Sequence, residues 1–213
     1  MKLRIARSAQ AQAITDLRKR AYQKGSKTHL IDDRFLEWNE DDENALILYL
    51  TNQNEIPISS IRLSMAFHKK QIEGLFDIRL LQNLEYPMLL LDKLTTAPEY
   101  RGRGLSAAMR YFILKSAVNS DVHNIAFTIN DGVSRKAHLL ELGFHLVKAD
   151  LSHRLNTTFQ NETDVLFGYL PQSQFQNAAK IALQNLKTPW SEFSLAADVP
   201  VMMEDFLRVR VEA

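Results

Sequence analysis

The chain has 213 residues, a formal net charge of +1, and ordinary shares of hydrophobic (46%) and charged (24%) residues, which suit one globular domain with a sizeable core. The near-neutral charge argues against nucleic acid as a partner. The absence of cysteine excludes disulfides, thiolate metal sites and a cysteine nucleophile, and we expect no metal. The N-terminal stretch MKLRIARSAQAQAITDLRKR lacks the apolar run of a signal peptide or membrane span, which favours a cytoplasmic protein.

The N-terminal part of the sequence predicts three strands and a helix. Residues 2–6 alternate polar and apolar, as a strand does, and Ser8 is expected to cap a helix that ends near residue 22. Residues 24–44 are expected to form a polar loop that carries a short helix. Residues 45–51 and 56–66 predict two strands joined by the turn NQNE.

The rest of the chain predicts an alternation of strands and helices, which indicates a mixed α/β fold. Residues 187–213 fit a helix, a strand or a packed tail. The other expected elements are, in order, strand 89–95, helix 105–118, strand 123–129, helix 133–142, strands 145–155 and 164–170, and helix 172–186.

Two of the 7 glycines lie in the run Arg101-Gly102-Arg103-Gly104, between an expected strand and an expected helix. Unpaired N–H groups at a helix N-terminus bind phosphate, and glycines let a ligand approach the main chain. The spacing matches neither a P-loop nor a dinucleotide fingerprint. Taken alone, the run predicts a phosphate site and a solvated surface turn equally well.

Two motifs resemble the GCN5-related N-acetyltransferase (GNAT) superfamily. TAPEYRGRGLS, residues 96–106, is similar to its V-x-P-x-Y-R-G-x-G signature, with Ser106 where Gly or Ala is usual. NDGVSRKAHLLELGF, which begins at Asn130, is similar to its N-x-x-A…LYEKLGF segment. The resemblance implies an α/β (α+β) fold: a mixed, mostly antiparallel central sheet, splayed between strands 4 and 5 and flanked by helices. It covers residues 1–170; residues 171–213 are expected to form a C-terminal helix and tail packed on the same domain.

The resemblance also implies acetyl-CoA or another acyl-CoA as cosubstrate. The fourth strand would pair with the pantetheine arm, the Arg-Gly run would bind the pyrophosphate, and the amide of Leu94 or Thr95 would bind the oxyanion. Because the acceptor amine attacks the thioester directly, no nucleophilic side chain is needed. The cofactor-binding residues implied in this way are Leu94, Thr95, Thr96, Arg101, Gly102, Arg103, Gly104, Leu105, Ser106 and Asn130.

Asp92, which lies inside an otherwise apolar strand, is the first candidate for the catalytic base or for binding the acceptor ammonium. The alternative is a structural ion pair with Lys93 or a nearby arginine. Many GNAT members place a tyrosine acid where this chain has Leu139. Either the thiolate leaves unassisted, or His138 or Ser134 supplies the proton.

Three N-terminal segments, LRKRAYQ, DDE and SSIRLS, resemble the N-acyl amino acid synthases and acyl-homoserine-lactone synthases. In that GNAT-like subgroup an early arginine and nearby acidic residues form the acceptor site, which implies substrate-binding roles for Arg18, Asp41 and Arg62. The alternative is a solvated helix face for Arg18 and an exposed loop for Asp41 and Asp42. Those enzymes take long acyl chains, often from acyl carrier protein.

The leading interpretation is an N-acyltransferase that moves an acyl group, expected to be acetyl, from acyl-CoA to a small-molecule primary amine. One alternative is a long-chain N-acyl amino acid or acyl-homoserine-lactone type synthase that uses acyl carrier protein. The other is a non-catalytic sensor that binds an acyl thioester, which the missing tyrosine suggests. A homodimer is left open. Apolar residues expected as the wall of a long-chain tunnel are Phe67, Leu75, Phe76, Leu80 and Leu81.

Overall fold

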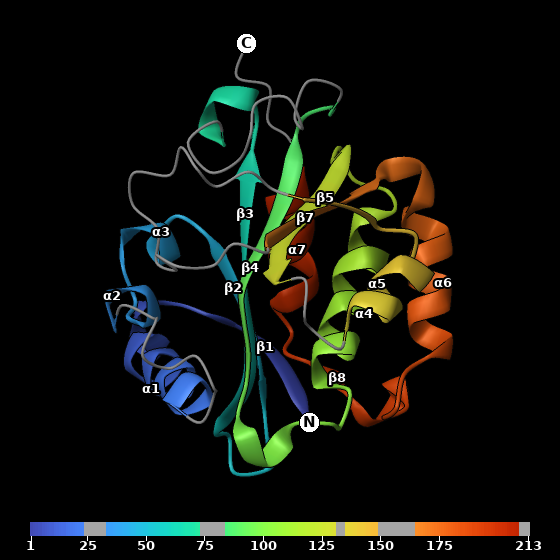
Figure 1. The fold of residues 1–213 in the computed structure, drawn as a ribbon. Coiled ribbons are helices and arrows are strands. Elements are labelled where there is room, and N and C mark those ends of the chain that lie inside the picture. Colours follow the sequence, from blue (N-terminus) through green and yellow to red (C-terminus); the bar gives the residue numbers. More distant parts are fainter. Residues whose placement is uncertain (24–32, 73–83, 131–134, 149–164, 209–213) are drawn as a thin grey trace.

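The computed structural model describes residues 1–23, 33–72, 84–130, 135–148 and 165–208. A central sheet separates α1, α2 and α3 on one face from α4, α5 and α6 on the other (Figure 1). The strands are β1 (Lys2–Ala6), β2 (Leu46–Thr51), β3 (Pro57–Ala66), β4 (Met88–Thr96), β5 (Asn124–Asn130), β6 (His145–Lys148), β7 (Val165–Pro171) and β8 (Ser194–Leu195). The α-helices are α1 (Ala11–Gln23), α2 (Asp33–Leu36), α3 (Glu40–Glu43), α4 (Leu105–Ala117), α5 (Lys136–Glu141), α6 (Phe175–Gln184) and α7 (Val199–Leu207).

The sheet has the strand order β6-β7-β5-β4-β3-β2-β1-β8. Among these described strands, β4–β5 and β1–β8 pair in parallel and the other neighbours pair antiparallel. The expected mixed, mostly antiparallel α/β architecture is therefore confirmed, including the central β4-α4-β5-α5-β6 succession.

The strands β4 and β5 separate along their length. They are paired only where Met88–Leu91 of β4 lies beside Asn124–Phe127 of β5, although β4 continues to Thr96 and β5 to Asn130. Their C-terminal halves therefore leave a gap at the centre of the sheet, as the resemblance implied. We call this opening the β4–β5 gap.

A bulge interrupts β4 next to this gap. Ser60 faces Thr95 and Arg62 faces Asp92, so β4 has one more residue than β3 in this interval. Lys93 has a φ of 46°, in the left-handed region that side chains other than glycine rarely adopt. A bulge changes the direction in which side chains point: Asp92 binds Arg62 and Lys93 binds Asp42, both on the α1 side of the sheet.

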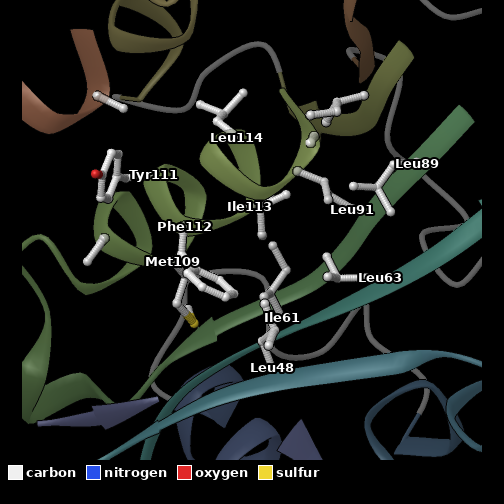
Figure 2. Packing of buried hydrophobic residues seen from close by; sticks show 14 of the residues in the cluster. Leu48, Ile61, Leu63, Leu89, Leu91, Met109, Tyr111, Phe112, Ile113 and Leu114 are labelled. Atoms are coloured by element: carbon white, nitrogen blue, oxygen red, sulfur yellow. The ribbon is translucent and has the colours of Figure 1, made fainter. Parts of the chain in front are cut away.

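The main core lies between the sheet and α4. The apolar side chains on one face of β2, β3 and β4 meet a helix that is apolar over most of its surface. Trp190, in the turn before β8, adds its ring to those of Tyr111 and Phe112. Figure 2 shows this packing for Leu48, Ile61, Leu63, Leu89, Leu91, Met109, Tyr111, Phe112, Ile113 and Leu114.

Some expected boundaries are wrong. Ser8 opens a short 3-10 turn, with Arg7 rather than Ser8 at its N-cap, and α1 begins at Ala11. Residues 187–213, left unassigned from the sequence, contain a 3-10 turn at Trp190–Glu192, then β8 and α7.

Other expectations lie beyond what the structure describes. They concern Ser134, residues 149–155 of the strand expected at 145–155, and the tunnel residues Leu75, Phe76, Leu80 and Leu81. Within the described ranges, no helix is both long and apolar enough to cross a membrane.

Candidate active site

The Arg-Gly run forms the turn between β4 and α4, and both of its glycines are left-handed. Gly102 has a φ of 77° and Gly104, the N-cap of α4, a φ of 80°. The C-terminal segment holds this turn by its carbonyls: Lys187 Nζ donates to Gly102 O (3.2 Å) and Thr188 Oγ1 donates to Arg103 O (3.0 Å). Among the described residues no side chain caps α4, so the amides at the start of this helix remain available to a ligand.

The two arginines of the turn differ in how they are held. The Arg101 guanidinium donates to the carbonyl of Ala21 near the end of α1, which ties the turn to that helix. The Arg103 guanidinium is stacked over the ring of Tyr100, 4.9 Å from its centroid. Arg103 is exposed on the same turn and can reach an anion without breaking an interior contact.

The main chain of β4 presents alternate residues to the gap. Ala97 N–H donates to Ile58 O of β3 (2.9 Å), and Ser59 Oγ donates to Thr95 O (2.7 Å), so the backbone groups of Thr95 and Ala97 face β3. Because successive residues of a regular strand direct their backbone groups to opposite sides, those of Thr96 face the gap. Thr95, one of the two residues whose amides are expected to bind an oxyanion, faces β3 instead, and Leu94, the other, directly follows the bulge at Lys93.

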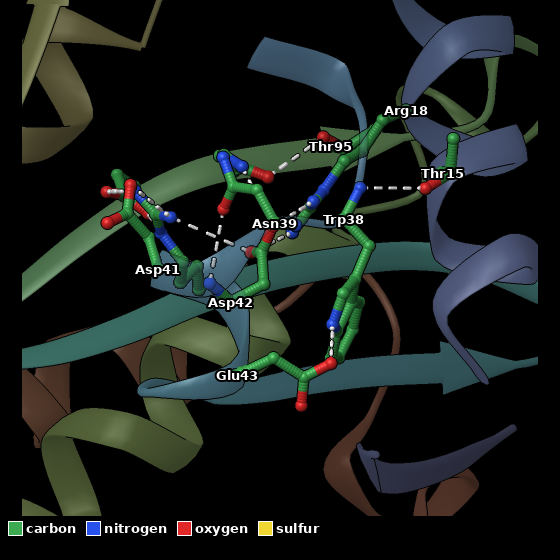
Figure 3. A network of polar contacts seen from close by, with 11 residues as sticks. Thr15, Arg18, Trp38, Asn39, Asp41, Asp42, Glu43 and Thr95 are labelled. Carbon is green, nitrogen blue, oxygen red and sulfur yellow. Dashed lines mark hydrogen bonds and ion pairs between the residues drawn. The ribbon is translucent and has the colours of Figure 1, made fainter. Parts of the chain in front are cut away.

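A buried ionic cluster lies on the α1 side of the sheet (Figure 3). Arg18 of α1 donates to both carboxylate oxygens of Asp42, at 2.8 and 2.9 Å, and Lys93 Nζ donates to the same carboxylate at 2.9 Å. Asn39 caps α3 by accepting from Asp42 N–H (3.3 Å), and Asp42 accepts from Asn39 N–H in return. This capping box places Asp42 in the interior, opposite Arg18.

The charges of this cluster are unequal in number. Burial alone would raise the pKa of Asp42, but its hydrogen bonds and attraction to Arg18 and Lys93 hold that pKa below its ordinary value. Burial and repulsion from Arg18 lower the pKa of Lys93, against the opposing effect of Asp42. One carboxylate therefore serves two fully buried cations, and both depend on it.

Arg62 and Asp92 extend the cluster toward the gap. They are register partners across β3 and β4, and their side chains form two hydrogen bonds of 2.7 Å. Arg62 also lies 3.5 Å from Asp41 and 3.7 Å from Asp42. Burial alone would lower the pKa of Arg62, but its bonds to Asp92 and the nearby carboxylates raise it. The structure thus brings Arg18, Asp42, Arg62 and Asp92 together, with the exposed Asp41 at the edge.

A pocket of about 50 Å³ occupies the β4–β5 gap. Asp92 contributes to its wall, although its oxygens already accept from Arg62. His138, the candidate acid, is not among the lining residues and lies 3.5 Å from Glu141 instead. Asn130 ends β5 at this gap. The pocket is lined by Ile61, Leu91, Asp92, Leu94, Arg110, Phe127, Thr128, Ile129, Arg135 and Leu139.

Arg110 is a pocket residue that the sequence did not single out. It lies in the middle of α4, is 7% exposed, and is the charged member of that helix's buried residues. Burial, together with the charge of Arg135, lowers the pKa of Arg110 to about 10. A signal was present in the sequence, since an arginine among the apolar residues of this helix breaks its pattern.

A larger hollow of about 550 Å³ lies outside the gap, between α1 and the β2–β3 turn. It is an open surface groove, with Asp16, Lys19 and Arg20 on its wall. Within the described parts of the chain, no three His, Cys, Asp or Glu side chains are grouped as a metal site requires. The chemistry-bearing groups therefore gather at the gap rather than in this surface groove.

No protein-family model and no curated protein matches the sequence. Solved structures do match the fold. The CoA-dependent acyl-homoserine lactone synthase BjaI, with SAM and isopentyl-CoA, is 10% identical with a TM-score of 0.62, over 95% of this chain and 97% of that one. A spermidine N-acetyltransferase SpeG chimera from Vibrio cholerae and hSSAT is 16% identical with a TM-score of 0.54, over 82% and 97%. A ribosomal-protein-alanine N-acetyltransferase from Brucella melitensis is 16% identical with a TM-score of 0.53, over 79% and 98%. At these identities the likeness is one of fold.

Proposed function

Because the chain has the GNAT fold, we propose that it is an acyltransferase that moves an acyl group from a CoA thioester to the primary amine of a small molecule. The observation that carries this proposal is the continuity of two features: the uncapped N-terminus of α4 and the backbone of β4 that faces the gap. One extended ligand with a diphosphate at one end and a thioester at the other fits both.

The coenzyme would lie along this path. The amides after Gly102 bind its diphosphate, and Arg103 adds a charge-assisted contact. The backbone of Leu94 and Thr96 pairs with the pantetheine arm. The Leu94 amide donates to the carbonyl oxygen of the thioester, where negative charge develops as the amine attacks.

Chemical balance requires no side-chain nucleophile. The amine nitrogen attacks the carbonyl carbon, the C–N bond forms, and the C–S bond breaks with its electron pair on sulfur. The proton that the amine loses ends on the departing thiolate. Since His138 does not line the pocket and Ser134, the other candidate acid, lies outside the described residues, departure without a side-chain acid is the proposed route.

Asp92 is proposed to orient the acceptor. Its carboxylate is 38% exposed at the pocket wall while Arg62 holds both of its oxygens. A carboxylate so held attracts an ammonium group and can pass its first proton to water. The neutral amine then attacks the thioester, and the second proton that its nitrogen loses is the one that ends on the thiolate. Arg18 and Asp42 would not contact the acceptor, because they are buried. They would act indirectly, by fixing Lys93 and with it the β4 bulge.

A second candidate function is an acyl-homoserine-lactone type synthase. It is favoured by the likeness to BjaI, which extends over nearly the whole of both chains and whose structure holds SAM and isopentyl-CoA. On this interpretation SAM is the acceptor amine. Acyl carrier protein remains the alternative donor, and a thioester-binding sensor is the non-enzymatic rival.

The test is to incubate the purified protein with acetyl-CoA, octanoyl-CoA or octanoyl-acyl carrier protein, each with SAM, amino acids and polyamines in parallel. Thiol release and mass spectra of the products identify donor and acceptor. Consumption of a CoA thioester with an amide product supports the proposal. Binding of a thioester without turnover by any amine would establish the sensor instead.

A matched pair of variants tests the coenzyme path. Arg103→Ala should weaken CoA binding, whereas Arg208→Ala, which removes an exposed arginine at the end of α7, should not. Equal affinity of both variants for CoA would contradict the role assigned to the turn.

A further inference from the structure

Arg110 is a buried cation without a counter-charge among the described residues. No hydrogen bond or ion pair joins its guanidinium to another residue in that part of the chain. Burial and, to a lesser extent, repulsion from the charge of Arg135 lower the pKa of Arg110. An unpaired buried charge is strongly unfavourable, so its retention calls for a partner that arrives from outside the protein.

The pocket in the β4–β5 gap is where such a partner can reach the Arg110 side chain. Arg110 and Arg135 both line the pocket in the β4–β5 gap, whose other walls are mostly apolar: Leu91 and Leu94 of β4, and Phe127 of β5. The acidic residue on this wall, Asp92, is already neutralised by Arg62. The pocket therefore combines apolar sides with an unsatisfied positive charge.

The position of the pocket relates it to the acyl group. Leu94 belongs to its wall, and the Leu94 amide is where the thioester carbonyl is proposed to lie. A chain attached to that carbonyl and directed away from sulfur enters the pocket and approaches α4. The enclosed volume of about 50 Å³ suits a few carbon atoms, since pockets for drug-sized ligands typically enclose about 300 Å³ or more.

We propose that the pocket selects a short acyl group that ends in a carboxylate, so that the donor is the CoA monothioester of a small dicarboxylic acid and Arg110 binds its free carboxylate. This inference rests on the proposed function, which it deepens by naming the acyl class. The planar guanidinium suits a carboxylate because it can donate two parallel hydrogen bonds. The transfer remains balanced as before: the thioester carbonyl passes to the amine, CoA leaves as the thiol, and the distal carboxylate is unchanged.

The test compares donors of equal carbon number. Succinyl-CoA and butyryl-CoA differ in one terminal group, a carboxylate against a methyl, and isothermal titration measures their affinity without any acceptor. The wild-type protein should bind succinyl-CoA about 10- to 100-fold more tightly, as expected for charge-assisted hydrogen bonds in a buried site. Free CoA serves as the reference for contacts outside the pocket.

Variants assign the effect to Arg110. Arg110→Met should abolish the preference for succinyl-CoA, while its affinity for free CoA stays within about twofold of wild type. Arg110→Lys should retain part of the preference, because lysine keeps the positive charge but cannot donate two parallel hydrogen bonds from a planar group. Arg208→Met, which replaces the exposed arginine directly after α7, should leave the preference intact. Circular dichroism of each variant confirms that it is folded.

Each outcome decides the matter. Equal affinity of the wild-type protein for the two thioesters overturns the inference, even if butyryl-CoA is turned over and the proposed function stands. A parallel loss of affinity for both thioesters and for free CoA in Arg110→Met also overturns it, since Arg110 would then bind the coenzyme itself. If no thioester binds, the proposed function fails first, and the inference falls with it.

Discussion

Arg18 and Asp42 meet in the protein interior through two hydrogen bonds of 2.8 and 2.9 Å, although one comes from α1 and the other from the short helix α3. This pair joins the N-terminal helix to the loop that follows it. Because Lys93 binds the same carboxylate, the pair also reaches the bulge of β4 and hence the candidate active site.

The first prediction concerns the loss of that carboxylate. Asp42→Asn removes the carboxylate that the buried Arg18 and Lys93 both bind, and should lower the free energy of unfolding by about 3–5 kcal/mol, measured by urea denaturation. The matched control is Asp41→Asn, whose side chain is 75% exposed and whose removal should cost less than about 1 kcal/mol. Equal losses in the two variants would contradict the assigned role.

The second prediction is the pH dependence of the same group. The pKa of Asp42 is lowered in the folded state, so its stabilisation is present above the unfolded pKa of about 4 and is lost as the pH falls through the lower folded value. The difference in unfolding free energy between wild type and Asp42→Asn should be constant from about pH 5 to 7 and shrink below about pH 4. A difference that does not change with acidification would show that Asp42 is not the group responsible.

The third prediction is that Arg110 reduces stability. Its charge is buried and has no partner among the described residues, so Arg110→Met should raise the unfolding free energy at pH 7 by about 1–3 kcal/mol. The folded pKa of about 10 lies below the ordinary value, so the penalty is present at neutral pH and is relieved only as the pH rises through that folded value. A less stable Arg110→Met protein would mean that the guanidinium has an interior partner after all.

The fourth prediction distinguishes two reasons for glycine in this turn, positive φ alone at Gly102 and positive φ with a close side chain at Gly104. A Cβ at Gly104 would meet Lys187 Cβ at 3.1 Å, whereas one at Gly102 would meet nothing within 4 Å, and both residues have positive φ. Gly102→Ala should cost about 1–2 kcal/mol of stability through backbone strain alone. Gly104→Ala should cost more and should weaken CoA binding, and Lys187→Gly in the same chain should recover part of the difference. Identical thermal melting curves for the two single variants would refute this distinction.

Much of the fold could be predicted because it is encoded locally. The apolar run of β2, the helical pattern of α4 and the turn chemistry of the Arg-Gly run depend on residues close together in sequence. The parallel step from β4 to β5 is typical of two strands that a helix connects, and the sequence predicts that helix.

The rest depends on contacts between distant residues. The bulge at Lys93 has no sequence signature, since a lysine at positive φ is unfavourable by itself and is held by Asp42. Asp42 could be interpreted as an exposed loop residue until its partner Arg18 was located. The orientation of Arg110 likewise depends on how α4 packs over the gap, which a helical pattern does not specify.

If the turn before α4 binds the coenzyme as proposed, the hydrogen bonds from Lys187 and Thr188 make coenzyme affinity depend on the C-terminal region as well. Proteolytic cleavage just before Lys187 would leave the strands on both sides of the β4–β5 gap intact and would still free this turn. A loss of CoA binding in the cleaved protein would then reflect the freed turn and not unfolding of the sheet.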